Sequence, residues 1–297
     1  MQFMEIGKTL ICRFDSCNDA VQSILQMKYK DRYLKVVDRD RIAFVGRKFE
    51  SIDDWKEYIL SGDENILDFM SKMKSNIKSQ IETPKVIRRR RMRFDESEGE
   101  EVIMENLYSG NPYWISMLGE MALNKRRVIS LIIPVQMNYT QNFNLVSLQS
   151  AGAILLTELL EKSGYSVELW LMAYSTKVYY KGDKEDSIAA IKLKDSKRPL
   201  NIQSISSICS GTFFRTGILT IWSSGNGVER DPRLHCGYSI KPNKENQWGI
   251  ISKSIGAKSK ENTYLIQTSS TFSKYHNQRF IRGLEDTLKE INSSNPK

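Results

Sequence analysis

One stretch of this chain, residues 128–174, constrains its fold more than any other part of the sequence. It begins with Val-Ile-Ser-Leu-Ile-Ile-Pro-Val, an almost unbroken apolar run of the length of one strand. Such runs are typical of strands buried on both faces, as in parallel sheets. After a polar loop comes an amphipathic segment over 145–163, which ends at Gly164, a natural helix stop. A second apolar run over 165–174 completes the order strand, helix, strand and predicts a βαβ unit.

Strands and helices alternate on both sides of this unit. The spacing of apolar residues and the turn signals predict helices over 15–27, 51–60 (capped by Ser51), 64–79, 113–123, 201–208 and 275–291. The same signals predict strands over 34–37, 42–45, 187–193 and 264–268, and leave 213–222 open between helix and strand. We therefore predict the α/β fold class, with a mainly parallel sheet flanked by helices and a small α+β N-terminal region.

Three regions follow from this pattern and from the distribution of charge. They are an N-terminal α+β region over 1–80, a charged connecting segment over 81–127, and the main α/β domain over 128–297. A chain of 297 residues is long enough to bury a hydrophobic core in one large domain or two ordinary ones.

The net charge of +9 is unevenly distributed. Residues 81–94 hold six basic and one acidic side chain, a net of +5, and residues 95–105 hold six acids and no base, a net of −6. Residues 177–297 hold 20 basic and 11 acidic side chains, again +9. Contact with a polyanion is therefore expected mainly from the C-terminal part of the chain.

The dense arginine run at 88–93 has two interpretations. We favour an Arg-rich strand or linker held by the acids that follow it or by a neighbouring subunit, because unpaired charges this dense repel. The alternative is a phosphate-binding stripe, with further bases placed near aromatic residues as in single-strand binders. The residues of this nucleic-acid hypothesis are Arg88, Arg89, Arg90, Arg91, Arg93, Lys181, Lys274, Arg279 and Arg282.

The cysteines and histidines fit no common zinc or nucleophile motif. Cys12, Cys17, Cys209 and Cys236 have neither C-x-x-C nor disulfide-scaffold spacing, and His235 and His276 are the only histidines. We interpret the cysteines as reduced thiols and expect no metal, no cofactor and no catalytic residue. Arg215, which follows two phenylalanines, is expected to be buried beside a carboxylate, the alternative being a phosphate-facing hook.

Several segments resemble a family of uncharacterised bacteriophage and mobile-element proteins. They are the arginine run with its acidic follower, Tyr-Ser-Gly-Asn-Pro at 108–112, Arg-Arg-Val-Ile-Ser-Leu at 126–131, the stretch 152–168, Lys-Leu-Lys-Asp at 192–195, Pro-Leu-Asn-Ile at 199–202 and Phe-Phe-Arg at 213–215. The resemblance implies phage origin and a von Willebrand factor A-like domain.

Such a domain implies a divalent metal held by an Asp-x-Ser-x-Ser loop after its first strand. The matching loop here has Gln136, Asn138 and Thr140 and no carboxylate, so we expect a degenerate loop that does not bind the metal.

Our leading hypothesis is a non-catalytic phage-encoded protein that acts through protein–protein contacts in an assembly. Its partners would be other phage or host proteins or a second copy of the chain. A basic nucleic-acid-binding protein is the alternative, and a metal-dependent hydrolase or nuclease is the third. The sequence has no run of about 18 apolar residues, so we expect no membrane partner and a location in the cytoplasm of the infected host or in the virion.

Overall fold

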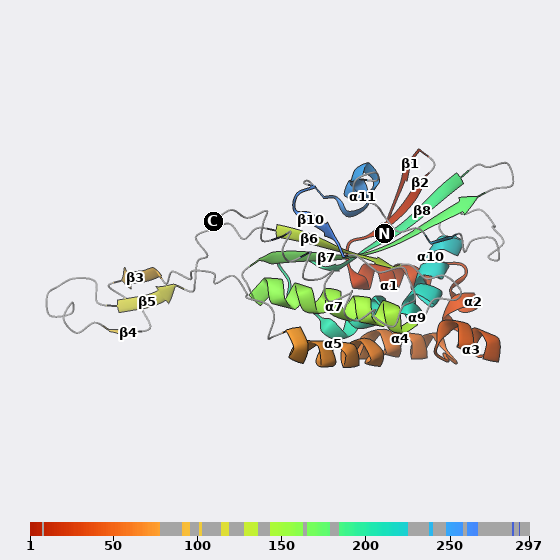
Figure 1. Ribbon diagram of the computed structural model, residues 1–297, viewed down its shortest axis with the longest axis horizontal. Helices are drawn as coiled ribbons and strands as arrows, with labels where there is room; N and C mark the ends of the chain where they lie inside the picture. Colours follow the sequence, from red (N-terminus) through yellow and green to blue (C-terminus); the bar gives the residue numbers. More distant parts are fainter. Residues whose placement is uncertain are drawn as a thin grey trace.

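The structure is a computed structural model, drawn in Figure 1. It describes residues 1–7, 9–77, 91–95, 101–102, 114–118, 128–135, 143–162, 165–178, 184–224, 238–239, 248–257, 260–266, 287 and 291. None of the helices in these ranges is long and apolar enough to cross a membrane.

A seven-stranded sheet forms the centre of the fold. Its strands are β1 (Gln2–Ile6), β2 (Thr9–Phe14), β6 (Val128–Val135), β7 (Ser166–Val178), β8 (Lys184–Lys194), β9 (Tyr238–Ser239) and β10 (Thr263–Leu265). Six of them follow the order β1-β2-β8-β7-β6-β10, and β9 pairs with β7. The pairs β2/β8, β6/β7 and β6/β10 are parallel, whereas β1/β2, β7/β8 and β7/β9 are antiparallel. The α/β class is confirmed, but the sheet is mixed and a mainly parallel one is not confirmed.

The predicted βαβ unit is confirmed. Strand β6 pairs in parallel with β7 from Val128 opposite Ser166 to Val135 opposite Ala173, and α7 (Phe143–Lys162) connects the two strands. Both strands are apolar on both faces because helices cover the sheet on both sides. In Figure 1, α7 lies under the sheet and α11 (Trp248–Ile255) lies on the opposite side.

The N-terminal residues contribute two strands to this same sheet. Strand β2 pairs in parallel with β8, and β1 pairs with β2 at the edge. The side chains of β2 and of the helices before residue 78 share one core cluster with β6, α7 and β7. Residues 1–77 and the described part of 128–297 therefore share one sheet and the larger of its two apolar clusters.

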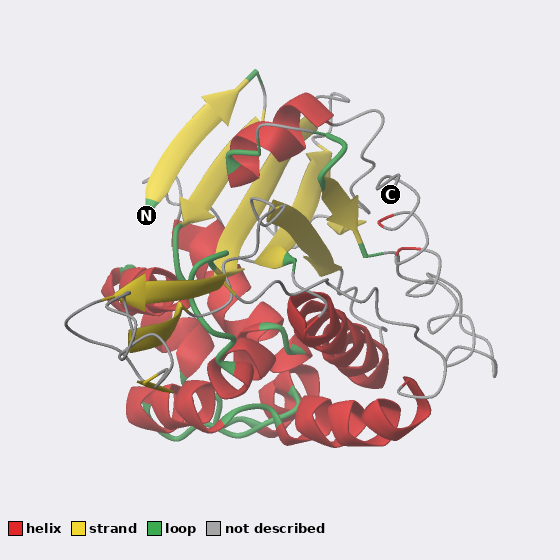
Figure 2. Ribbon diagram, turned by 90° about the vertical axis from the view of Figure 1, so that its left-hand side faces the viewer, coloured by secondary structure: helices red, strands yellow, loops and turns green. Residues whose placement is uncertain are grey.

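Helices of residues 1–77 lie on the same side of the sheet as α7 in Figure 1, and Figure 2 shows most of the helices gathered on that side. They are α1 (Cys17–Gln26), α2 (Lys30–Leu34), α3 (Arg39–Val45), α4 (Ile52–Ser61) and α5 (Glu64–Ile77). Helices α1, α4 and α5 confirm the predictions for 15–27, 51–60 and 64–79. The cap of α4 is a reciprocal box: Ser51 accepts from the Asp54 amide at 3.1 Å, and Asp54 accepts from the Ser51 amide at 2.9 Å.

The strands predicted over 34–37 and 42–45 are wrong. Leu34 is the buried last residue of α2, and Val36 makes only an isolated bridge to Phe49. The segment 42–45 belongs to α3, which ends at Gly46 in the left-handed conformation with φ of 83°. Segments of four mostly apolar residues are too short to define a period, so helix and strand cannot be told apart from them.

The helix predicted over 113–123 is also wrong where the structure describes it. Residues 114–118 form β5 (Trp114–Leu118), which lies between β3 (Arg91–Asp95) and β4 (Glu101–Val102) in a separate antiparallel sheet. Backbone pairing on both sides of β5 outweighs the helical spacing of its apolar residues. Strand β3 contains the end of the arginine run, as the strand interpretation expects.

The remaining helices follow β8. They are α8 (Ile202–Ile208), α9 (Gly211–Phe213), the π-helical turn η1 (Phe214–Ile218) and α10 (Leu219–Ser224). The helix over 201–208 is confirmed, with Asn201 as its cap, and 213–222 is helical. Strand β10 confirms the late strand. The C-terminal helix over 275–291 lies outside the described residues, apart from Thr287 and Ile291, and stays a prediction.

Two apolar clusters lie on the two faces of the sheet. The larger one joins the sheet to α1–α5 and α7–α10, and the smaller one lies beneath α11, with Trp170, Met172 and Tyr174 of β7 among its members. The residues of β7 alternate between them because successive side chains of a strand point to opposite faces.

Candidate functional site

A cleft opens where β2 and β8 end. The two strands are parallel, so their carboxyl ends lie at the same edge of the sheet, the place where α/β proteins bind ligands. The cleft has a volume of about 790 Å³, within the range of ligand sites. Its lining comes from the segment after β2, the end of β8 with the turn that follows, and helices α1, α4 and α8.

A β-bulge sends two lysines of the cleft to opposite faces of the sheet. The register between β7 and β8 shifts so that Trp170 faces Lys192 while Leu169 faces Lys194. The ammonium of Lys194 is directed to the α7 side, where it lies 2.5 Å from Glu161 Oε1. It also donates to the carbonyls of Val167 and Asp195 at 3.1 and 2.9 Å. With its side chain 1% exposed, Lys194 fixes the end of β8 onto α7.

On the opposite face, two cations lie against the ring of Trp170. The Arg13 guanidinium carbon is 5.3 Å and the Lys192 Nζ is 4.9 Å from the ring centroid. Gly256, with φ of +67°, allows this arrangement, since a Cβ there would lie 2.7 Å from Arg13 Nη1. Trp170 is fully buried, and its indole N–H has no hydrogen-bond partner within the described residues. The Lys192 side chain thus lies against Trp170 on this face, and Lys192 is also one of the residues that line the cleft.

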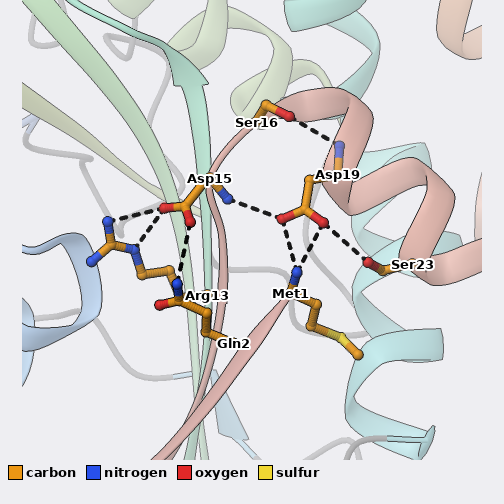
Figure 3. A network of polar contacts seen from close by, with 7 residues as sticks. All are labelled: Met1, Gln2, Arg13, Asp15, Ser16, Asp19 and Ser23. Carbon is orange, nitrogen blue, oxygen red and sulfur yellow. Dashed lines mark hydrogen bonds and ion pairs between the residues drawn. The ribbon is translucent and has the colours of Figure 1, made fainter.

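The carboxylates beside β2 are engaged by neighbouring groups, as Figure 3 shows. Asp15 forms an ion pair with Arg13 at 3.0 Å, and the amide of Gln2 lies 3.5 Å from its second oxygen. Asp19 accepts from the Met1 amino group at 2.9 Å, the Asp15 amide at 3.2 Å and the Ser23 hydroxyl at 3.4 Å. Partial burial works to raise the pKa of Asp19, but these donors outweigh it and lower the pKa. The lowered pKa keeps Asp19 ionised, and both carboxylates have partners within the protein.

Two cations at the mouth of the cleft have no ion-pair partner of this kind within the described residues. Lys197 and Arg198 lie in the turn after β8, are exposed, and take part in no ion pair within the residues that the structure describes. Lys192 is held loosely, with Glu168 and Asp195 both at 3.8 Å from its Nζ. The charge that the cleft offers to a ligand is consequently positive.

The thiol in the wall of the cleft is not activated. Cys17 Sγ contacts the carbonyls of Leu193 and Lys192 at 3.5 and 3.9 Å. Burial raises its pKa to about 12, and burial does the same to the pKa of Cys12. Burial also raises the pKa of Cys209 well above its ordinary value, with a smaller contribution from Cys17. A thiol becomes a nucleophile as its thiolate, so these three cysteines are inert at neutral pH.

Thiol labelling tests this arrangement. A rise in pKa from 9.0 to about 12 lowers the thiolate fraction at pH 8 by about three orders of magnitude. We expect iodoacetamide to leave Cys12 and Cys17 unmodified in the folded protein and to modify both quickly in urea, as followed by peptide mass spectrometry. Modification of Cys17 at the rate of a free thiol in the folded protein would contradict its burial.

Most of the site residues predicted from the sequence lie outside the described residues. This holds for Arg88, Arg89, Arg90, Lys181, Lys274, Arg279 and Arg282, and for the loop positions Gln136, Asn138 and Thr140. Arg91 and Arg93 lie in β3, and the structure describes only their backbone. Those predictions stay open. Within the described residues, no three His, Cys, Asp or Glu side chains come close enough together to hold a metal ion.

Arg215 is buried, as predicted, and lies on the π-helical turn η1. Its guanidinium donates to the Phe44 carbonyl, and its central carbon is 4.4 Å and 4.5 Å from the ring centroids of Phe44 and Phe143. These contacts join α3 to the start of α7. They assign the residue a structural role between two aromatic rings, and its pairing with a carboxylate stays a prediction.

The sequence did not single out the residues that form the cleft. Arg13 lies in β2 and Asp15 directly follows it, and the sequence pattern did not predict this strand. Trp170 was interpreted only as part of an apolar run. The one available signal was the polar cluster after each strand, Asp-Ser-Cys-Asn-Asp at 15–19 and Lys-Leu-Lys-Asp at 192–195.

Comparison with known proteins identifies a family. No curated protein and no solved structure matches the chain. One protein family, described as "Domain of unknown function (DUF7192)", matches residues 3–294, from β1 almost to the C-terminus. The match spans nearly the whole chain, and the protein therefore belongs to this family of domains of unknown function.

Proposed function

We propose that this protein is a non-catalytic binding protein that acts through contacts with another protein, and that the cleft at the ends of β2 and β8 is its docking site. The observation that carries the proposal is the composition of the cleft. Its sides bring apolar residues of α4 and α8 next to polar groups at the strand ends. This combination of apolar surface and a few placed polar groups is typical of a recognition site.

Leu60 gives the docking hypothesis a specific point of contact. It is the most exposed large apolar side chain in the described part of the chain, at 71%, and it lines the cleft. Its neighbour Ile59 is almost fully buried in the core. An exposed leucine at the edge of a cleft exposes apolar surface that a partner would cover.

The other hypotheses from the sequence stay predictions. These are phage origin, a degenerate von Willebrand factor A-like domain, the location in the cell or virion, nucleic-acid binding and metal-dependent hydrolysis. Nucleic-acid binding has a direct test, because affinity that depends on phosphate contacts falls steeply between low and moderate salt.

A photo-crosslinking residue tests the docking site. Placed at Leu60 in the cells that naturally make the protein, it should give a covalent adduct with a second polypeptide under ultraviolet light. The matched control is Val37, an apolar residue that is 54% exposed and lies outside the lining of the cleft. An adduct twice the mass of the chain would identify a second copy as the partner. Equal adducts at both positions, or none at Leu60, would contradict the proposal.

A further inference from the structure

We infer that the segment that docks in this cleft is acidic, with an apolar side chain next to its carboxylates. The inference rests on the proposed function and adds the chemistry of the partner. Three features carry it: the state of the carboxylates in the cleft, the turn that presents Lys197 and Arg198, and the apolar residues of α4 and α8.

The acids of the cleft are already paired and do not compete for its cations. Asp15 binds Arg13, and Asp19 accepts from several donors around the start of α1. Asp195 accepts from the backbone amide of Lys197 at 2.9 Å and lies 3.8 Å from Lys192 Nζ. Of the two other acids near the bulge, Glu161 is paired with buried Lys194 and Glu168 lies 3.8 Å from Lys192 Nζ. Each negative charge of the site has a partner, whereas two positive charges do not.

The turn after β8 fixes the position of these two cations. The Asp195 side chain accepts from the amide of Lys197, and its carbonyl accepts from the amide of Arg198 at 3.3 Å. Such a turn, closed by an aspartate side chain, holds the backbone in one conformation. Lys197 and Arg198 therefore project from a fixed point at the mouth of the cleft. A guanidinium and an ammonium placed together favour carboxylate, which Arg binds through two parallel hydrogen bonds.

The apolar residues supply the second half of the recognition. Val21 of α1, Ile59 and Leu60 of α4, and Ile205 and Ile208 of α8 line the cleft. An aliphatic or aromatic side chain of the partner would cover Leu60, and a carboxylate next to it in the partner would reach Lys197 and Arg198.

A nucleic acid fits this site less well than an acidic protein segment. A phosphate backbone presents a continuous row of negative charges and needs a row of cations along its path. Here the two unengaged cations are adjacent, and Asp15, Asp19 and Asp195 lie on the same lining. A longer row of phosphates would meet these carboxylates, whereas one or two carboxylates would meet Lys197 and Arg198 alone.

Fluorescence anisotropy with labelled peptides of equal length tests the inference. The probe alternates glutamate and leucine, a second peptide has glutamine for glutamate, a third has serine for leucine, and a single-stranded oligonucleotide is the fourth. We expect the glutamate–leucine peptide to bind most tightly. The double variant Lys197→Glu/Arg198→Glu should weaken its binding at least about tenfold, because each substitution replaces attraction by repulsion. A carbodiimide should couple its carboxylates to Lys197 in the wild-type protein.

The matched control has the same change in net charge on the opposite side of the sheet. Lys253 lies exposed on α11 and Lys260 lies exposed before β10, and neither lines the cleft. The variant Lys253→Glu/Lys260→Glu should bind the peptide within about twofold of wild type, since screening confines the effect to nearby charges. Equal losses of peptide affinity in both double variants would mean that net charge alone causes the effect, and would overturn the inference.

The remaining outcomes separate this inference from the proposed function. If the glutamine peptide binds as tightly as the glutamate peptide, the acidic chemistry is wrong while docking at Leu60 stands. If no peptide binds but the Leu60 adduct forms, the acidic chemistry is wrong as well. If the oligonucleotide instead binds more tightly than the glutamate–leucine peptide and loses this binding in the Lys197→Glu/Arg198→Glu variant, the ligand of the cleft is a nucleic acid and not a protein segment. Absence of both adduct and peptide binding would overturn both proposals.

Discussion

Replacing Trp55 by alanine should lower the free energy of unfolding by about 3–5 kcal/mol, the range found when a large buried aromatic residue is removed. Trp55 is fully buried on α4, and its indole N–H donates to the Thr216 hydroxyl at 3.0 Å. Its ring stacks on Phe213 with centroids 6.1 Å apart. The side chain thus joins α4 to the π-helical turn, which lies 161 residues further along the chain. Urea denaturation followed by circular dichroism measures the loss.

Two further substitutions separate the causes of this loss. Trp55→Phe keeps most of the aromatic surface and removes the hydrogen bond, so we expect a loss of about 1 kcal/mol. Leu60→Ala, five residues later and mostly exposed, should change stability by no more than about 0.5 kcal/mol. If Trp55→Ala were no more destabilising than Leu60→Ala, the packing of α4 on η1 would be wrong.

Replacing Glu161 by glutamine should cost about 3 kcal/mol. The substitution keeps the shape of the side chain but removes the negative charge that lies 2.5 Å from the buried ammonium of Lys194. An unpaired buried charge destabilises a protein by several kcal/mol, and the partial exposure of Glu161 reduces the effect toward the lower end of that range. The end of β8 should loosen as well, which hydrogen exchange of the amides near residue 194 would detect.

Glu158, one turn earlier on the same helix, is the matched control. Its carboxylate pairs with Lys74 and Lys162 at 3.0 and 2.5 Å, and both lysines are about half exposed. Glu158→Gln should therefore cost less than about 1 kcal/mol, and the cost should shrink with added salt. The double variant Glu161→Gln/Lys194→Met should recover part of the loss of Glu161→Gln, because it removes the unpaired charge. No recovery in the double variant would contradict the ion pair.

Long segments and segments with a local cap could be predicted from the sequence, and several others could not. The unit of β6, α7 and β7 was predictable because its apolar runs are long and because a glycine follows the helical pattern in the sequence. The helix α4 was predictable because the cap at Ser51 is a local interaction. The segments 34–37, 42–45 and 113–123 failed because their few apolar residues fit two periods, and pairing or packing with distant residues decided between them.

The candidate site was not predictable because it is assembled from distant residues. Cys17 contacts the carbonyl of Leu193 across 176 residues of chain. Arg13 and Lys192 meet on one tryptophan only because β2 lies beside β8 and β8 lies beside β7. No local spacing encodes the order of strands in a sheet. The parallel pairing of β2 with β8, which brings two polar strand ends together, is therefore the information that the sequence pattern lacked.

The position of β2 in the sheet also has a consequence for the way this protein is made on the ribosome. Residues 9–14 are synthesised early, but the strand beside them, β8, is complete only at Lys194. At a translation rate of about 5–20 residues per second, β2 waits roughly 10–40 s for its neighbour. Ile11, Cys12 and Phe14, all buried in the final fold, have only β1 to pair with during that time. The nascent chain should therefore depend on chaperones that shield its first strand until the centre of the sheet emerges.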